Sequence, residues 1–250
     1  MIRAEINMKN ELKLLVSISE VDEALDAFKG GADIIDIKNP KEGALGANFP
    51  WVIEKVRKIL GDKAQISATI GDMPNLPGTA SLAALGAAYS GANYVKVGLF
   101  GMNSFNDALY MMENVVKSVK DYNSKVKVIA SGYADYAEFK GLNPLMIPKI
   151  ANESRADGVL IDVKNKGKLN LFNFLNLYQL QKFIDESHKL NLTVALAGGL
   201  DKGDVVKIKE LGADIIGVRR AVCEKLNDTF GKVRKDFVLD FVKTIKSFQG

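Results

Sequence analysis

The pattern that decides the fold begins with Gly-Ala-Asp-Ile-Ile-Asp-Ile-Lys-Asn-Pro at residues 31–40, where a glycine-containing turn leads into a short apolar run. The same Gly-Ala-Asp/Asn turn recurs at residues 91–93 and 212–214, each time before another apolar run, and a weaker copy lies at residues 156–158. These turns follow stretches with helical spacing, so they mark the return from a helix to a strand. The sequence therefore predicts repeated strand–helix units.

Short apolar runs with strand character recur along the whole chain, and each is followed by a helix or a helix-sized segment. The expected strands lie at about residues 12–18, 33–40, 64–70, 94–100, 126–131, 158–163, 192–197 and 215–218. The expected helices lie at about residues 20–29, 49–59, 80–90, 105–122, within 144–155, and at 175–190, 202–211 and 232–248. Ser19 is the expected N-cap of the first helix.

Because no linker or low-complexity segment interrupts this alternation, the units predict an α/β protein with a single closed (β/α)8 barrel, the TIM-barrel fold. We expect residues 12–250 to form the barrel catalytic domain, after an N-terminal extension at residues 1–11. A doubly wound open sheet is the alternative. Against it, the chain has neither a Gly-x-Gly-x-x-Gly fingerprint after the first strand nor a P-loop.

The composition is that of a globular protein, with 47% hydrophobic and 26% charged residues among 250. The net charge of +4 comes from mixed acids and bases, which argues against a nucleic-acid partner and suits small anionic ligands. Cys223 is the single cysteine, so an intramolecular disulfide is excluded. No apolar run has the length of a membrane span and the first residues do not resemble a signal peptide, so we expect a soluble cytoplasmic protein without a membrane partner.

The run at residues 31–40 carries an acid and an amine on one face of its strand. Side chains alternate across a strand, so Asp36 and Lys38 share one face while Ile35 and Ile37 share the other. The isoleucines need an apolar partner, which leaves Asp36 and Lys38 facing elsewhere. A buried ion pair and a functional site both fit this stretch taken alone.

Other strands place polar residues in the same position. Lys96 interrupts the apolar face of its strand and must point into the barrel, as must Asp162 on strand six, while Arg219 is in phase with Gly217. Polar residues expected at the catalytic, carboxyl-terminal ends of the strands are Asp36, Lys38, Thr69, Asp72, Lys96, Asp162, Lys164, Lys166, Gly198, Gly199, Arg219 and Arg220. A structural salt-bridge cluster is the alternative, but charged groups on alternate strands near this end favour a function.

Lysines that point into a barrel suit carbonyl chemistry. A desolvated lysine beside a second cation loses its proton more easily and can attack an aldehyde or ketone to form a Schiff base. Gly198, Gly199 and Arg219 follow strands seven and eight, where barrels often bind phosphate through backbone N–H groups. The residues alone therefore predict a sugar phosphate that reacts through a lysine imine.

Other residues give weaker predictions of a functional role. His188 is the single histidine and is expected at the surface, and Cys223 is expected to be structural or incidental. No set of residues has metal-ligand spacing, so we expect neither a metal nor another cofactor. Lys149 and Asp135 fit the rim of the site and the outer surface equally well.

With these residues identified, the chain resembles the archaeal (5-formylfuran-3-yl)methyl phosphate synthases, also called 4-(hydroxymethyl)-2-furancarboxaldehyde-phosphate synthases, of methanofuran biosynthesis. The resemblance extends from about Leu14 to the last helix. It is carried by the segments GGADIIDIKNP (30–40), GANFPW (46–51), SATIGD (67–72), SLAALG (81–86), YVKVGL (94–99), IPKIA (147–151) and ALAG (195–198).

The resemblance implies a carbon–oxygen lyase, related to class I aldolases, that joins two molecules of glyceraldehyde 3-phosphate and loses one phosphate and two waters to form a furan. It implies that Lys38 is the Schiff-base lysine and Lys96 the proton acceptor. Asp36 and Asp162 would assist proton transfers, and Lys166 matches a further active-site lysine. The chain departs from the family in having both Lys164 and Lys166 where one lysine is expected, and Arg220 where a small residue is expected.

Two alternatives stay open at this point. One is another class I aldolase acting on a different sugar phosphate, and the other is a non-catalytic sugar-phosphate-binding barrel. Barrels of this size commonly self-associate, so we expect a homo-oligomer.

Overall fold

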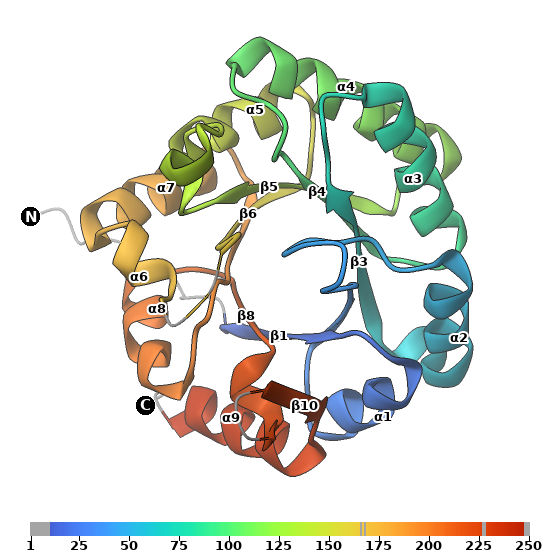
Figure 1. Cartoon of the computed structure of the whole chain (residues 1–250), viewed down its shortest axis with the longest axis vertical. Coiled ribbons are helices and arrows are strands. Elements are labelled where there is room, and N and C mark those ends of the chain that lie inside the picture. Colours follow the sequence, from blue (N-terminus) through green and yellow to red (C-terminus); the bar gives the residue numbers. More distant parts are fainter. Residues whose placement is uncertain (1–10, 166, 168, 227–228, 248–250) are drawn as a thin grey trace, which may run out of the picture.

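The strands close into a ring surrounded by helices (Figure 1). The computed structural model describes residues 11–165, 167, 169–226 and 229–247. The barrel has the order β1-β2-β3-β4-β5-β6-β7-β8, with every neighbouring pair parallel and β8 paired to β1. The prediction of a closed (β/α)8 barrel is therefore confirmed. The expected N-terminal extension, apart from Glu11, lies outside the described residues.

The strands and helices follow the predicted order. The barrel strands are β1 Lys13–Ile18, β2 Ile34–Ile37, β3 Gln65–Asp72, β4 Tyr94–Gly98, β5 Lys127–Tyr133, β6 Gly158–Asp162, β7 Thr193–Leu196 and β8 Ile215–Val218. The α-helices are α1 Val21–Lys29, α2 Pro50–Leu60, α3 Pro77–Tyr89, α4 Phe105–Tyr122, α5 Ile147–Glu153, α6 Leu171–Phe174, α7 Leu177–Lys189, α8 Val205–Leu211 and α9 Lys235–Ser247. Short 3₁₀ turns lie at η1 Gly61–Lys63, η2 Tyr136–Phe139, η3 Pro144–Met146, η4 Lys202–Asp204 and η5 Arg220–Val222.

A hairpin between β8 and the last helix was not predicted. The strands β9 Cys223–Leu226 and β10 Thr229–Val233 pair antiparallel, with Val233 opposite Cys223. The closing helix was expected from residue 232, but α9 begins at Lys235, because residues 229–233 belong to β10. The predicted helix therefore started about three residues too early.

The start of α1 also differs from its prediction. Ser19 was expected as the N-cap, but the helix begins at Val21 with Glu20 in the cap position. The reason is Glu23, whose carboxylate accepts hydrogen bonds from the backbone N–H groups of Ser19 and Glu20 at 2.7 and 3.1 Å. Ser19 uses its hydroxyl to donate to the same carboxylate.

Two apolar regions determine which side chains face the barrel interior. The larger one fills the space between the strands and the helices. The smaller one lies inside the ring and consists of Leu15, Ile34, Ile129, Leu160, Ala195 and Ile215, with Tyr94 packed against it. Because side chains alternate, the residues two positions further along these strands also face inward, and several of them are polar. The interior therefore has an apolar floor with a polar layer above it, towards the carboxyl ends of the strands.

Within the described part of the chain, no helix combines the length and the apolar character that crossing a membrane requires.

Candidate active site

A tightly buried ion pair lies in the polar layer. The Lys96 Nζ is 2.7 Å from Asp36 Oδ1, and these side chains are only 3% and 0% exposed to solvent. Ser17 donates its hydroxyl to the other carboxylate oxygen of Asp36 at 3.0 Å. Lys96 points into the barrel because side chains alternate along β4, and Tyr94, two residues earlier, packs on the apolar floor of the same interior.

Burial has opposite consequences for the two members of this pair. It is the largest influence on Asp36 and would raise the pKa of the carboxyl, but the charges of Lys96 and Lys38 outweigh it and hold the pKa below its usual value. For Lys96, burial dominates and lowers the pKa of the amine, although Asp36 opposes this. Asp36 therefore stays ionised, while Lys96 gives up its proton more readily than an exposed lysine does.

The apolar floor beneath Lys96 accounts for the desolvation of its amine. A small internal cavity next to the amine is lined by Leu15, Ile34, Ile129, Leu160 and Ile215, which supply no charge to solvate an ammonium group. Lys96 therefore has its single close carboxylate partner on one side and an apolar wall below.

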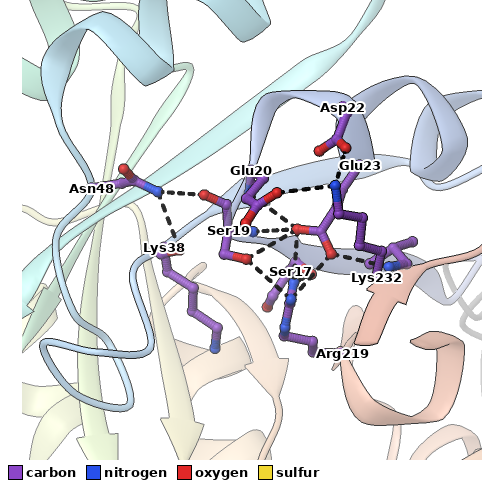
Figure 2. Close-up of polar contacts among 10 residues, drawn as sticks. Ser17, Ser19, Glu20, Asp22, Glu23, Lys38, Asn48, Arg219 and Lys232 are labelled. Atoms are coloured by element: carbon purple, nitrogen blue, oxygen red, sulfur yellow. Dashed lines mark hydrogen bonds and ion pairs between the residues drawn. The ribbon is translucent and has the colours of Figure 1, made fainter. Parts of the chain in front are cut away.

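A second acid–lysine pair lies closer to the mouth. Lys38 directly follows β2 and continues its extended course, because the Lys38 backbone N–H donates to the backbone carbonyl of Ile18 in β1 at 3.0 Å. Its Nζ is 3.6 Å from Asp162 Oδ2, and both side chains are buried. Asn48 donates to the backbone carbonyls of Lys38 and Ser19, at 3.4 and 2.9 Å. Figure 2 shows the Lys38 side chain extending away from this backbone contact.

The pocket beside Lys38 continues to the ends of β7 and β8. It is lined by Ser17, Lys38, Asp162, Gly198, Gly199, Arg219 and Arg220, among others. Gly198 has a φ of +107°, and a Cβ there would lie 2.7 Å from Val163 Cγ2. At Gly199, with φ +75°, a Cβ would lie 2.8 Å from Arg220 Nη2. The left-handed backbone conformation favours glycine at both positions, and at Gly198 the close approach of Val163 also leaves no room for a Cβ.

Arg219 lines this pocket with its guanidinium already engaged by the β1–α1 turn (Figure 2). It donates to both carboxylate oxygens of Glu23, at 3.1 and 3.2 Å, and to the Ser17 carbonyl and the Ser19 hydroxyl. Burial would raise the pKa of Glu23, but Arg219 and the surrounding donors lower it. Glu23 also accepts from the backbone N–H of Val233 at 3.0 Å, so the β9–β10 hairpin is fastened to the same carboxylate.

A third polar centre surrounds Asp72 at the end of β3. Tyr133 of β5 donates its hydroxyl to Asp72 Oδ1, and the Lys164 Nζ is 2.8 Å from Asp72 Oδ2. The backbone N–H groups of Ala44 and Leu45 donate to the same carboxylate at 3.0 and 3.1 Å. Asp72 therefore ties the β2–α2 loop, the blue segment that reaches over the ring in Figure 1, to β3, to β5 and to Lys164 just after β6.

The family model described as 4-HFC-P synthase matches residues 14–241 of this chain.

This chain belongs to the 4-HFC-P synthase family.

Relatives named (5-formylfuran-3-yl)methyl phosphate synthase include those of Methanococcus maripaludis and Methanocaldococcus jannaschii, at 46% and 45% identity. Each alignment covers 93% of this chain and 99% of the relative.

Solved structures with the same fold are far less similar in sequence. KGPDC from Streptococcus mutans has a TM-score of 0.68 at 16% identity, and the match covers 96% of this chain and 100% of that one. A 3-hexulose-6-phosphate synthase has a TM-score of 0.60 at 18% identity, with 95% and 98% covered. At such identities the likeness concerns the barrel fold alone.

The remaining sequence-predicted residues of this 4-HFC-P synthase family member fall into different places. Lys166 lies outside the described residues. Thr69 donates to the Gly46 carbonyl at 2.7 Å and so supports the β2–α2 loop. Asp135, for which rim and surface fitted equally well, is buried and accepts the backbone N–H groups of Lys164 and Asn165, each at 2.8 Å. It holds the β6–α6 loop in place.

Two further candidates, Lys149 and His188, lie outside the mouth of the barrel, and a third, Cys223, has an unreactive thiol. The Lys149 side chain is 71% exposed, lies 3.7 Å from Glu153 and stacks over Phe105, so it belongs to the outer surface. His188 pairs with Asp214 at 3.0 Å beside α7, also outside the mouth. Burial raises the pKa of the Cys223 thiol to about 11, which makes it a poor nucleophile. The described residues include no group of three or more His, Cys, Asp or Glu that could hold a metal ion.

Tyr133 is the mouth residue that the sequence analysis missed. The alternation along β5 carried a signal for it, since Ile129 packs on the inner floor and Ser131 and Tyr133 follow at two-residue steps. The strand had been expected to end at residue 131, which left Tyr133 in a loop.

Proposed function

We propose that this chain condenses two molecules of glyceraldehyde 3-phosphate through a Schiff base on Lys38, with loss of one phosphate and two waters, to give (5-formylfuran-3-yl)methyl phosphate. The observation that carries the proposal is the pocket in which the Lys38 amine, its Asp162 partner and the Gly198–Gly199 turn share one wall. Membership of the 4-HFC-P synthase family supports the same reaction.

Lys38 is the proposed nucleophile because it combines burial with access to this pocket. Its amine attacks the substrate aldehyde, the C–N bond forms and the carbonyl oxygen leaves as water, which gives an iminium ion. Asp162, 3.6 Å away, is placed to take up and return the protons of these steps.

Lys96 is the proposed proton acceptor. The iminium weakens the adjacent C–H bond, and a neutral amine can remove that proton to give the enamine that attacks the second aldehyde. Burial on the apolar floor favours the neutral form of Lys96, and Asp36 holds the amine in place from 2.7 Å. Asp36 then stabilises the ammonium group that forms.

For the substrate phosphate, we propose the turn at Gly198 and Gly199, whose backbone N–H groups can donate to anionic oxygens. Arg219 completes the wall, although its two terminal guanidinium nitrogens already donate to Glu23 and to Ser17 and Ser19. Direct contact between phosphate and one of these nitrogens would exchange an existing hydrogen bond. Arg220, which lies against Gly199 and donates to the Gly167 carbonyl at 2.7 Å, adds positive charge on the same side.

The proposal is tested by incubating the purified protein with glyceraldehyde 3-phosphate and identifying the product by ultraviolet absorption and mass. We expect the furan aldehyde phosphate from the wild type and from Lys149→Ala, the surface-lysine control. We expect a loss of at least ~10³-fold for Lys38→Ala, which removes the nucleophile. A folded Lys38→Ala protein that makes the furan at the wild-type rate would refute the proposal. A different aldol product would identify another class I aldolase, and stabilisation by the substrate without turnover would identify a binding protein.

A further inference from the structure

Tyr133 places a hydroxyl group in the mouth of the barrel that the reaction outlined above does not use. It is opposite Asp162 in the β5–β6 register and so faces inward with it. The residue is 2% exposed. A buried phenol that shares the interior with two acid–lysine pairs is in a position to take part in proton transfer.

The phenolic oxygen lies on the mouth side of Lys96. Gly98 follows Lys96 by two residues and shares its face of β4. A Cβ at position 98 would come closer to the Tyr133 Oη than real Cβ atoms approach other atoms, so the hydroxyl occupies the space above Gly98. Along the β4 wall, the Tyr133 hydroxyl therefore lies one inward-facing position beyond Lys96, in the direction of the mouth.

The hydroxyl is held in this place from several sides. Asp72 accepts its hydrogen bond, and Asp72 is itself fixed by Lys164 at 2.8 Å and by the Ala44 N–H at 3.0 Å. The ring packs edge-on against Phe100 and Phe139, with centroid distances of 6.1 and 5.8 Å. Burial, followed by the charge of Asp72, raises the pKa of Tyr133 well above its usual value, so the resting group is protonated and can serve as an acid but not as a base.

We propose that the Tyr133 hydroxyl, which donates to Asp72 in the resting site, turns its proton to substrate hydroxyl groups as they leave as water. This inference rests on the proposed function, because ring closure to a furan requires the loss of two waters. In each elimination, Lys96 removes a proton from carbon, the C–H electron pair becomes the new double bond, and the C–O bond breaks. The departing oxygen takes the Tyr133 proton. The Lys96 ammonium then returns a proton to the phenolate, so the site is restored without an oxidant or reductant.

The step is chemically reasonable despite the weak acidity of the phenol. An alcohol oxygen that leaves without a proton becomes hydroxide, which is far more basic than a phenolate, so a tyrosine can protonate it. The transient phenolate is adjacent to Asp72, and the Lys164 ammonium, 2.8 Å from that carboxylate, offsets the second negative charge.

Tyr133→Phe tests the proposal, because it removes the hydroxyl and keeps the ring. Tyr94→Phe is the matched control, since Tyr94 also lies on a barrel strand but packs on the apolar floor at the opposite end. We expect furan formation to fall by about 100-fold or more in Tyr133→Phe and to stay near wild type in Tyr94→Phe. Borohydride trapping on Lys38 should persist in Tyr133→Phe, with an adduct heavier by at least one water than the most dehydrated wild-type adduct.

Wild-type furan production by Tyr133→Phe would overturn the role of the hydroxyl. If the wild type forms no adduct on Lys38, the proposed function itself fails, which is a distinct result. If Tyr133→Phe neither melts cooperatively nor traps substrate, 3-fluorotyrosine at position 133 replaces it, because this residue keeps the hydroxyl and acidifies it. An altered ratio of hydrated to dehydrated adducts would then support the proposal, and an unchanged ratio would overturn it.

Discussion

The Lys96–Asp36 and Lys38–Asp162 pairs inside the barrel use the same residue types in different surroundings. Lys96 and Asp36 are 2.7 Å apart above an apolar floor, whereas Lys38 and Asp162 are 3.6 Å apart in the wall of a pocket. The deep pair is the tighter one, and the looser pair lines the pocket that we propose for the substrate. This difference suits a base that must be desolvated and a nucleophile that must leave its partner to attack a carbonyl.

The largest expected effect comes from breaking the deep pair. Lys96→Met keeps the length of the side chain but removes the base, so furan formation should fall by about 10²- to 10⁴-fold. It also leaves the Asp36 carboxylate buried without its cation, which should lower the free energy of unfolding by about 3–5 kcal/mol. Urea denaturation measures the second effect. Lys38→Met, at the looser pair, should destabilise the protein less, and the reverse order would contradict the comparison.

The Glu23–Arg219 ion pair has no proposed part in the chemistry and serves as a comparison for these stability effects. Glu23→Gln removes the charge that binds Arg219 and should lower the free energy of unfolding by about 1.5–3 kcal/mol, the range of hydrogen bonds to a charged group. Trapping of substrate on Lys38 should persist. Because the folded-state pKa of Glu23 lies below the usual 4.5, its stabilising contribution is complete above that pH and is lost as the pH falls through the folded-state value. The wild type should therefore lose more stability than Glu23→Gln on acidification below pH 4.5.

The smallest expected effect is a shift in pH dependence. Lys96 acts as a base only when it is neutral, so the rate should rise with pH through its pKa, which lies below the usual 10.5. Asp36 opposes the lowering caused by burial, so Asp36→Asn should move this rise to lower pH. Asp162 has a weaker influence on Lys96, so Asp162→Asn should move it less. A larger shift in Asp162→Asn than in Asp36→Asn would contradict the assignment of this rise to Lys96.

The barrel and the inward orientation of its charged side chains could be predicted from the sequence alone. Alternation within β2, β4 and β6 depends only on neighbours in the chain, and it correctly placed Asp36, Lys38, Lys96 and Asp162 together in the interior. Which carboxylate joins which lysine depends on the register and tilt between strands, so the pairing became visible only in the structure.

Contacts between distant segments could not be predicted in the same way. Arg219 contacts Glu23 across 196 positions of the chain, and Glu23 contacts Val233 across 210. Charged side chains near a strand end or in a first helical turn are common, so neither residue signalled its partner. The Tyr133–Asp72 contact was missed for a related reason, since it joins the ends of β5 and β3 across 61 positions of the chain.

The most direct test of the central claim is borohydride reduction in the presence of glyceraldehyde 3-phosphate, followed by peptide mapping of the intact wild-type protein. The account predicts substrate-derived mass on the peptide that contains Lys38, and none on the peptide that contains Lys96, because the deep lysine is held as a base. Label on Lys96, or on neither lysine, would contradict it.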